Sequence, residues 1–195
     1  MTSGSYHGPM VKVGVLALQG DFREHVRVLA EIGAAPIEVR TPTQLDDVQA
    51  LVIPGGESTT IGRLARSAEL VEPIRRRARD GMPVLGTCAG MIVMAERVID
   101  GEPLLRLMDV TVRRNAYGRQ VESFEADVSV EGLDHAVRGV FIRAPWIEEL
   151  GADVRILAEH EERPVVLQQG HLLAASFHPE LVGETGLHDT FLSLV

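Results

Sequence analysis

Short apolar runs alternate with segments of helical periodicity along the first half of the chain. The apolar runs of strand length are 11–18, 36–40, 50–53 and 82–85. Apolar residues recur at helical spacing in 22–30, 60–68, 73–79 and 89–99. Nearly continuous apolar runs are typical of strands that are buried on both faces of a parallel sheet. The pattern therefore predicts an α/β fold with helices on both faces of the sheet.

The pattern changes near residue 110, where short β-type runs follow one another with few helical segments between them. These runs are 121–130, 140–143, 154–159, 165–168 and 172–177. They predict mixed or antiparallel pairing, and residues 186–195 predict a closing helix with Leu187, Phe191 and Leu194 facing inward. The expected fold is a three-layer sandwich with a mixed, mostly parallel central sheet flanked by helices, which is flavodoxin-like.

The length and composition suit one domain. A chain of 195 residues can bury a full hydrophobic core, so we expect a single domain over 11–195. Residues 1–10 are small and polar, and we expect a disordered extension or a short remnant of the cloning vector, not a secretory signal. The net charge of -9 argues against nucleic acid or a membrane surface as the partner. The single cysteine excludes an internal disulfide and favours a reducing cytoplasm.

The only cysteine, Cys88, lies where an apolar run ends and a helical segment begins. The sequence GTCAG, from Gly86 to Gly90, has the G-x-C-x-G form of a nucleophile elbow, with sulfur in place of the serine oxygen. A sharp strand-to-helix turn of this kind raises the central side chain above the sheet, and the start of a helix favours the thiolate. The alternative is a buried cysteine that serves only as a small hydrophobe.

A cysteine nucleophile needs a base, and the base needs an orienting group. His178 ends the apolar run 172–177 and is followed by Pro179 and Glu180. In extended chain, residues two apart project to the same side, so the carboxylate of Glu180 can orient the imidazole of His178 toward Cys88. The sequence therefore indicates a Cys88–His178–Glu180 triad.

The remaining histidines lie in polar contexts. His25 falls on the polar side of the first predicted helix, where we expect a solvated surface residue, and His188 has no distinguishing feature. At the start of the same helix, Asp21 and Glu24 have the spacing of a capping box. No cluster of His, Cys, Asp and Glu has metal-ligand spacing, so the sequence predicts no metal and no cofactor.

The turn PGGES, from Pro54 to Ser58, follows a predicted strand and should lie at the same sheet edge as Cys88. It is glycine-rich and precedes a helix, which suits anions, but it lacks the Gly-Lys-Ser/Thr of a nucleotide-binding P-loop. Its backbone N–H groups suit an oxyanion hole, and a tight turn without a ligand is the alternative. Arg143 and the arginines of 113–119 suit a substrate carboxylate, although on position alone solvated surface charge is the simpler explanation for each.

Five separated motifs, together with LALQGDFREH at 16–25, resemble the class I glutamine amidotransferases. The five are PGGEST (54–59), GTCAG (86–90), RNAYGRQ (114–120), FIRAP (141–145) and SFHPE (176–180). GxCxG with HPE indicates only the superfamily, whereas RNAYGRQ, FIRAP and LQG-x-x-REH resemble the glutaminase subunits of pyridoxal 5′-phosphate synthase (the PdxT/SNO family). The resemblance extends from about Val11 to the C-terminus.

This resemblance implies hydrolysis of L-glutamine to L-glutamate and ammonia through a glutamyl thioester. Cys88 would be the nucleophile, His178 the base and acid, and Glu180 the orienting carboxylate. The oxyanion hole would be formed by Gly56 and Ala89. The residues implied at the glutamine site are Gly56, Glu57, Ser58, Arg114, Ile142 and Arg143.

The resemblance also implies a partner. Ammonia would pass to a separate synthase subunit of the PdxS/SNZ type, a (β/α)₈ barrel that makes pyridoxal 5′-phosphate from ribose 5-phosphate and glyceraldehyde 3-phosphate. Twelve copies of each subunit can assemble in this family, and Gln19 is implied in docking and activation. Two alternatives stay open: the glutaminase subunit of another amidotransferase, such as the imidazole glycerol phosphate branch, and a DJ-1-type cysteine sensor without enzymatic activity.

Overall fold

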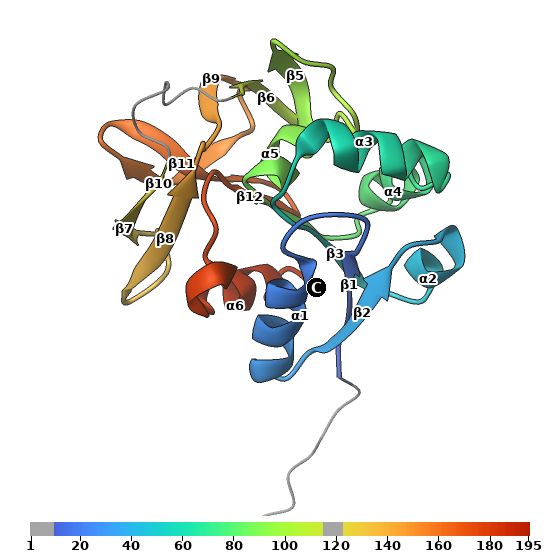
Figure 1. Ribbon diagram of the computed structural model, residues 1–195. Helices are drawn as coiled ribbons and strands as arrows, with labels where there is room; N and C mark the ends of the chain where they lie inside the picture. The colour runs from blue at the N-terminus through green and yellow to red at the C-terminus, as the bar shows by residue number, and fades with distance from the viewer. Residues whose placement is uncertain (1–9, 115–122) are drawn as a thin grey trace, which may run out of the picture.

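The computed structural model describes residues 10–114 and 123–195, and a sheet of seven strands lies at its centre (Figure 1). The spatial order is β10-β11-β12-β4-β3-β1-β2. The strands are β1 (Lys12–Leu16), β2 (Ala35–Val39), β3 (Ala50–Ile53), β4 (Val84–Thr87), β10 (Arg155–His160), β11 (Arg163–Gln169) and β12 (Leu172–Ala175). Neighbours from β12 to β2 pair in parallel, and β10, β11 and β12 pair antiparallel. The expected mixed, mostly parallel sheet is therefore confirmed.

Residues 1–9 and 115–122 lie outside the described part of the chain. They include all but Met10 of the expected N-terminal extension and all but Arg114 of the RNAYGRQ motif.

Each inner strand is buried on both faces, which explains its continuous apolar sequence. In β3, Ala50 and Val52 pack into one core cluster, whereas Leu51 and Ile53 pack into the other. All four side chains are fully buried. Successive residues of a strand point to opposite faces, so a strand covered on both sides has no polar position to alternate with.

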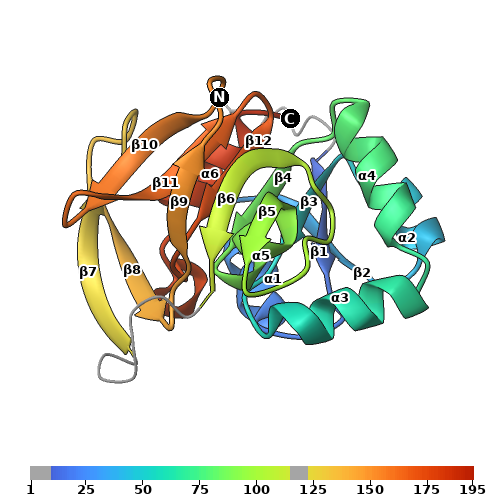
Figure 2. The same ribbon diagram turned by 90° about the horizontal axis from the view of Figure 1, so that it is seen from above.

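Helices form the two outer layers of the sandwich (Figures 1 and 2). The helices are α1 (Phe22–Glu31), α2 (Pro42–Asp46), α3 (Ser58–Ser67), α4 (Val71–Arg79), α5 (Ala89–Met94), the 3₁₀ turn η1 (Glu180–Val182) and α6 (Gly186–Leu192). Buried residues of α2, α3, α4 and α5 belong to the cluster on one face of the sheet. Leu29 of α1 and Leu187 and Phe191 of α6 belong to the other cluster, together with residues of the antiparallel pair β7 (Ser123–Ser129) and β8 (Ala136–Ile142).

One predicted element is wrong. The helix expected over 89–99 ends at Met94, and Ala95–Ile99 forms strand β5, which pairs in parallel with β6 (Met108–Arg113). At Ala95 the backbone turns to the extended region, with ψ 143. The hydrogen-bonding partner of β5 comes later in the chain, so local periodicity does not reveal it. Antiparallel β9 (Trp146–Leu150) completes this small sheet, and the sequence pattern predicted neither β6 nor β9.

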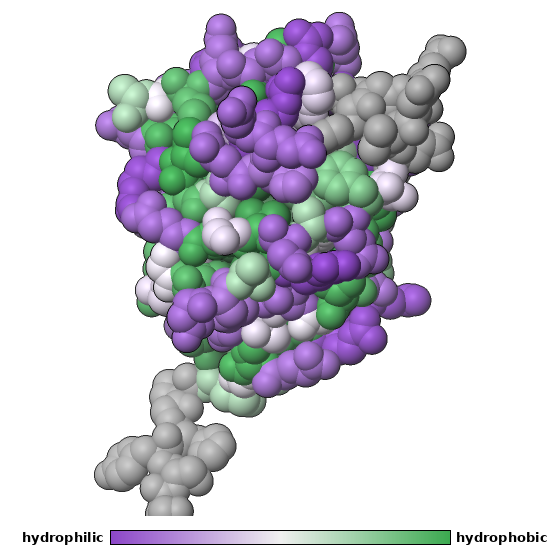
Figure 3. All heavy atoms as spheres, turned by 90° about the vertical axis from the view of Figure 1, so that its left-hand side faces the viewer, coloured by the Kyte–Doolittle hydropathy of each residue, from purple (hydrophilic) through white to green (hydrophobic). Residues whose placement is uncertain are grey.

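The outer face of the β7–β8 pair is polar. Arg138 of β8 makes ion pairs at 3.0 Å with both Glu125 and Asp127 of β7. Figure 3 shows the side of the molecule on which this pair lies, and hydrophilic side chains are interspersed there with hydrophobic ones. Across the described residues, no helix is long and apolar enough to cross a membrane.

Candidate functional site

The predicted catalytic residues meet at the carboxyl edge of the central sheet. Cys88 follows β4 directly, the turn from Pro54 to Glu57 follows neighbouring β3, and His178 lies three residues after β12 on the other side of β4. Because parallel strands end at one edge, segments far apart in the sequence become neighbours there. The convergence expected from the sequence is therefore present.

Cys88 has the strained backbone of a nucleophile elbow. Its φ is 49 and its ψ is -105, in a region that L-residues rarely occupy. A Cβ added at Gly90 would lie 2.1 Å from the carbonyl oxygen of Ile53, and one at Gly86 would lie 2.5 Å from Sδ of Met94. Both flanking glycines are therefore required by the close approach of the helix α5 to the strands below it. The Cys88 N–H donates to the Ala175 carbonyl at 2.8 Å, which ties the elbow to β12.

His178 and Glu180 form the expected pair, with His178 Nδ1 2.8 Å from Glu180 Oε1. The backbone differs from the expectation of extended chain, because Pro179 is helical (φ -71, ψ -30) and Glu180 begins η1. The two side chains thus meet across a turn, and the carboxylate lies fully buried below the ring. The backbone of His178 is held by two hydrogen bonds to Val140 of β8, at 2.8 and 3.2 Å.

The electrostatics of the pair favour ionised partners. Burial lowers the pKa of His178, but its hydrogen bonds with Cys88 and Glu180 outweigh burial and raise the pKa to about 11. Burial likewise opposes the charged form of Glu180, and the nearby His25 and His178 hold the pKa of this carboxyl well below its usual range. An imidazolium beside a cysteine stabilises the thiolate, which is the nucleophilic form.

A cavity of about 400 Å³ opens above Cys88 and His178. Every predicted site residue except the buried Glu180 lines it. The lining residues are Gln19, Asp21, Gly56, Glu57, Ser58, Cys88, Ala89, Ile92, Arg114, Ile142, Arg143, His178 and Leu181. The volume is within the ordinary range of small-molecule sites, which is about 300–1,000 Å³.

Charged side chains on the wall of this cavity differ in their partners. Arg114 makes an ion pair with Glu57 at 3.2 Å. Burial opposes ionisation of Glu57, yet hydrogen bonds from Thr60 and Thr59 at the start of α3 lower its pKa to about 2. Arg143 has no carboxylate within 4.0 Å among the described residues, so its guanidinium can take an external anion.

The loop after β1 packs against the glycine turn. The Glu57 N–H donates to Gln19 Oε1 at 2.8 Å, and a Cβ on Gly56 would lie 2.6 Å from the same oxygen. A Cβ on Gly55 would lie 2.1 Å from Cε1 of His178. The glycines of this turn therefore allow both the Gln19 side chain and the His178 ring to approach the backbone.

Asp21 has a different role from the one expected. It precedes α1, but its side chain makes no capping hydrogen bond, so the predicted capping box is wrong. Its Oδ2 lies 3.3 Å from His178 Nδ1 instead. Within the described ranges, Asp21, His178 and Glu180 are also the one group whose ligand atoms are close enough to share a metal ion, within 4.8 Å of one another. Because Nδ1 of His178 is already engaged by Glu180, a metal there would have to break the orienting bond.

Two histidines of the site were misjudged from the sequence. His25 and His188 are fully buried, and Nε2 of His25 lies 3.4 Å from Glu180 Oε1. His25 shares a helix face with buried Val28 and Leu29, at spacings of three and four residues. That spacing was the available signal, whereas the polar neighbours of His25 suggested exposure.

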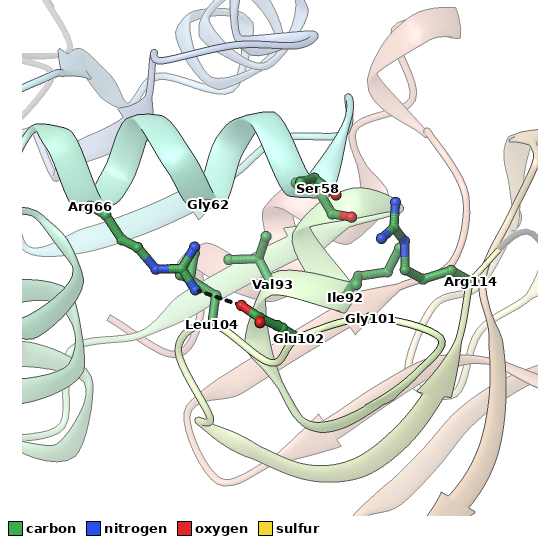
Figure 4. Close-up of a pocket in the computed structure, with 10 residues that line it drawn as sticks. Ser58, Gly62, Arg66, Ile92, Val93, Gly101, Glu102, Leu104 and Arg114 are labelled. Atoms are coloured by element: carbon green, nitrogen blue, oxygen red, sulfur yellow. Dashed lines mark ion pairs between the residues drawn. The ribbon is translucent and has the colours of Figure 1, made fainter.

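A second, smaller cavity of about 250 Å³ adjoins the first and shares Ser58, Ile92 and Arg114 with it. Figure 4 shows that Arg66 of α3 and Glu102, an ion pair at 3.7 Å, lie at the end away from Ser58 and Arg114. This cavity is an extension of the site between α3 and α5.

An elbow cysteine after β4 and a His-x-Glu pair after β12, at one edge of a three-layer α/β sandwich, define a class I glutamine amidotransferase. A solved structure described as a glutamine amidotransferase superposes with a TM-score of 0.89 at 49% identity and covers 93% of this chain and 97% of that one. The model of the SNO glutamine amidotransferase family matches residues 15–195, and the chain belongs to this family.

The names of similar proteins are consistent with this family. A protein of Parafrankia sp. (strain EAN1pec) named "Pyridoxal 5'-phosphate synthase subunit PdxT" is 56% identical over 188 residues, which are 94% of this chain and 93% of that protein. A protein of Desulforudis audaxviator (strain MP104C) with the same name is 54% identical over 188 residues, covering 95% of this chain and 100% of the relative.

The His178 ring should titrate far above its ordinary pKa of 6.5, near 11. Because the folded-state pKa is raised, protonation of His178 stabilises the fold fully below about 6.5, and this contribution is lost as the pH rises toward 11. Ring NMR shifts, assigned with His178→Gln, measure the midpoint, and Glu180→Gln should move it to lower pH. A wild-type midpoint near 6.5 would contradict the ion-pair geometry.

Proposed function

We propose that the chain is the glutaminase subunit of pyridoxal 5′-phosphate synthase and hydrolyses L-glutamine to L-glutamate and ammonia. The observation that carries the proposal is the grouping of Cys88, His178 and Glu180, with Cys88 and His178 lining a cavity whose wall also holds Arg143, an arginine without an ion-pair partner among the described residues. The family and the names of the relatives support the same activity.

The chemistry is acyl transfer through sulfur. Sγ of Cys88 attacks the side-chain carbonyl carbon of glutamine, and the C–N bond breaks as His178 delivers a proton to the leaving nitrogen, which departs as ammonia. The product is a γ-glutamyl thioester. His178 then takes a proton from water, whose oxygen attacks the thioester carbon; the C–S bond breaks, glutamate is released, and the Cys88 thiolate is regenerated beside the protonated His178. Glu180 keeps Nδ1 of the ring occupied, so that Nε2 faces the sulfur and the substrate.

The backbone N–H groups of Gly56 and Ala89 form the oxyanion hole of this proposal. Ala89 is the first residue of α5, and an N–H at that position has no acceptor within its own helix. Gly56 lines the same cavity. One donor of this kind typically contributes roughly 3–4 kcal/mol to the barrier reduction.

The substrate's amino-acid end lies along the charged wall. We assign the α-carboxylate of glutamine to Arg143, whose guanidinium has no ion-pair partner among the described residues. Glu57, kept ionised by the start of α3 and braced by Arg114, offers a negative charge to the α-ammonium group. Ser58 and Ile142 complete the lining.

The partner is the synthase subunit. Ammonia released at Cys88 is consumed there, with ribose 5-phosphate and glyceraldehyde 3-phosphate as the carbon substrates, in a barrel of the PdxS/SNZ type and an assembly of twelve and twelve. The complex works in the cytoplasm, where a reducing environment preserves the single catalytic thiol.

The docking surface is the rim of the cavity. Ile142, Leu181 and Val182 expose 36%, 37% and 43% of their surfaces, and they are among the few large hydrophobic residues exposed in the described chain. Ile142 and Leu181 line the cavity mouth. Gln19 lines it too and holds the Glu57 N–H, so a partner that moves Gln19 also acts on the oxyanion turn.

Replacing the nucleophile or the base should abolish ammonia release from glutamine. Cys88→Ala and His178→Ala are expected to lower kcat by about 10³-fold or more, because each removes a member of a unit that acts together. The assay couples ammonia to glutamate dehydrogenase, with and without the synthase subunit, whose addition should raise wild-type activity. Intact turnover in His178→Ala would remove the triad assignment.

Arg143→Ala should mainly weaken substrate binding. Loss of the α-carboxylate contact is expected to raise KM about 10-fold or more with a smaller change in kcat, since charged hydrogen bonds contribute about 1.5–3 kcal/mol. Steady-state kinetics measures the two separately, and Arg163→Ala is the control, because Arg163 packs over the Trp146 ring and neither residue lines the cavity. An unchanged KM would refute the carboxylate assignment.

Val182→Asp should reduce activation by the synthase subunit. A charge on the exposed apolar rim opposes docking, and Val182 is not part of the cavity lining, so activity without the partner should be retained. Titrating the synthase subunit against ammonia release measures the half-saturating concentration. Val195→Asp is the matched control, because Val195 is equally exposed, at 42%. Equal activation of both variants would place the interface elsewhere.

A further inference from the structure

Two buried histidines, His25 and His188, extend from the triad carboxylate into the core, and the proposed reaction assigns neither of them a step. His25 on α1 and His188 on α6 are both fully buried. Nδ1 of His25 lies 2.8 Å from Nε2 of His188. On its other edge, Nε2 of His25 lies 3.1 Å from Thr87 Oγ1 and 3.4 Å from Glu180 Oε1. A continuous row of polar groups therefore runs from α6, through α1, to the triad carboxylate.

The protons on this row can be assigned from its neighbours. Burial and the nearby His25 lower the pKa of His188 to about 3, so the His188 ring is neutral. A single proton is shared between Nδ1 of His25 and Nε2 of His188, and either nitrogen can be its donor. At the other edge of His25, a carboxylate oxygen would repel a bare ring nitrogen, so the stable arrangement has an N–H on Nε2. This N–H is hydrogen-bonded to Thr87 Oγ1 at 3.1 Å, and Oε1 of Glu180 lies 3.4 Å from the same nitrogen.

Glu180 needs this second donor. A buried carboxylate is costly unless it is paired and hydrogen-bonded, and Glu180 exposes no surface at all. His178 supplies one donor to Oε1, at 2.8 Å, and no hydrogen-bond partner of Oε2 is found in the described part of the chain. His25 is the other group with a ring nitrogen within 4.0 Å of Oε1.

We propose that His25 is a positioning residue of the triad, which holds the Glu180 carboxylate ionised and oriented toward His178, and that His188 fixes the ring of His25. His25 does not touch substrate in this account; it acts through Glu180. The charged and titratable groups around it are Glu180 of η1, His188 of α6 and, one group further away, His178 and Asp21. This inference rests on the proposed function, because it deepens the role of the same triad.

Three variants at one position separate positioning from packing. In His25→Gln, the amide nitrogen is as many bonds from Cα as Nε2 of histidine and can donate to Glu180. In His25→Asn, the amide nitrogen matches Nδ1, so the contact with His188 is kept and that with Glu180 is lost. His25→Leu removes both contacts. A residue that only fills space would not distinguish the first two variants.

Two readouts are used on the full chain. The first is the rate of alkylation of Cys88, the only thiol, by iodoacetamide as a function of pH, which reports the reactivity of the sulfur beside His178 without requiring turnover. The second is glutamine hydrolysis in the presence of the synthase subunit, with kcat and KM determined separately. Thermal unfolding of each variant reports its stability.

The expected result is a graded one. His25→Gln keeps the alkylation rate at pH 7 and kcat within about threefold of wild type, whereas His25→Asn and His25→Leu lower both by about tenfold or more and shift the pH profile, with KM within about twofold. His171→Gln is the control, because among the described residues the His171 ring is hydrogen-bonded only to the Ala78 carbonyl, at 2.7 Å, and it should behave as wild type.

Three results would overturn the proposal. The first is wild-type behaviour of His25→Leu, and the second is an equal loss of alkylation rate and kcat in His25→Gln and His25→Asn. The third is a loss of activity that follows the unfolding temperature alone, including failure of both His25→Asn and His25→Leu to fold. If wild-type protein fails to release ammonia from glutamine while alkylation shows the graded response, the positioning role stands and the proposed function is wrong. The two failures are thus distinguishable.

Discussion

The catalytic edge depends on the burial of one negative charge, the carboxylate of Glu180. At a position with no exposed surface, an ionised carboxylate persists only where donors surround it. The donors come from opposite ends of the chain: His178 follows β12, and His25 belongs to α1. Compensating this charge therefore ties α1 and η1 to the same end of the sheet. The contacts of Glu180 with His178 and His25 also orient His178, the catalytic base. One set of contacts therefore both stabilises the buried charge and positions the base.

Close backbone approach is the second constraint, and it explains where the motifs need glycine. A Cβ atom at Gly90 would clash with the carbonyl oxygen of Ile53, and one at Gly55 would clash with the imidazole ring of His178. The strained backbone at Cys88 persists because α5 is pressed onto β3 and β4 at this point. The sulfur, the glycine turn and the imidazole are thus brought together by packing that tolerates no extra methyl group.

The sequence predicts this architecture well where burial is two-sided. The run Ala50–Ile53 is buried on both faces, so its composition alone identifies a central strand, and the order of strands brings Cys88 and His178 to one edge. Prediction from local sequence fails where the secondary structure or the burial of a residue depends on partners distant in the chain. Ala95–Ile99 is a strand only because β6 lies beside it, and local periodicity suggested helix. His25 is buried because α6 and η1 cover it, which its polar neighbours in sequence could not indicate.

Two carboxyl groups reach the same nitrogen of His178, and their environments separate them. Glu180 is 2.8 Å from Nδ1, and the histidines around it outweigh burial and depress its pKa. Asp21 is 3.3 Å away and about one-third exposed, at 35%, and burial raises its pKa despite the neighbouring His178. As the pH falls, Asp21 takes a proton first, and the bond from Nδ1 to Glu180 survives. Neighbouring carboxyl groups whose pKa values diverge can take different roles. Here Glu180 stays ionised and maintains the orientation of the His178 ring, whereas Asp21 is the carboxyl that is protonated first.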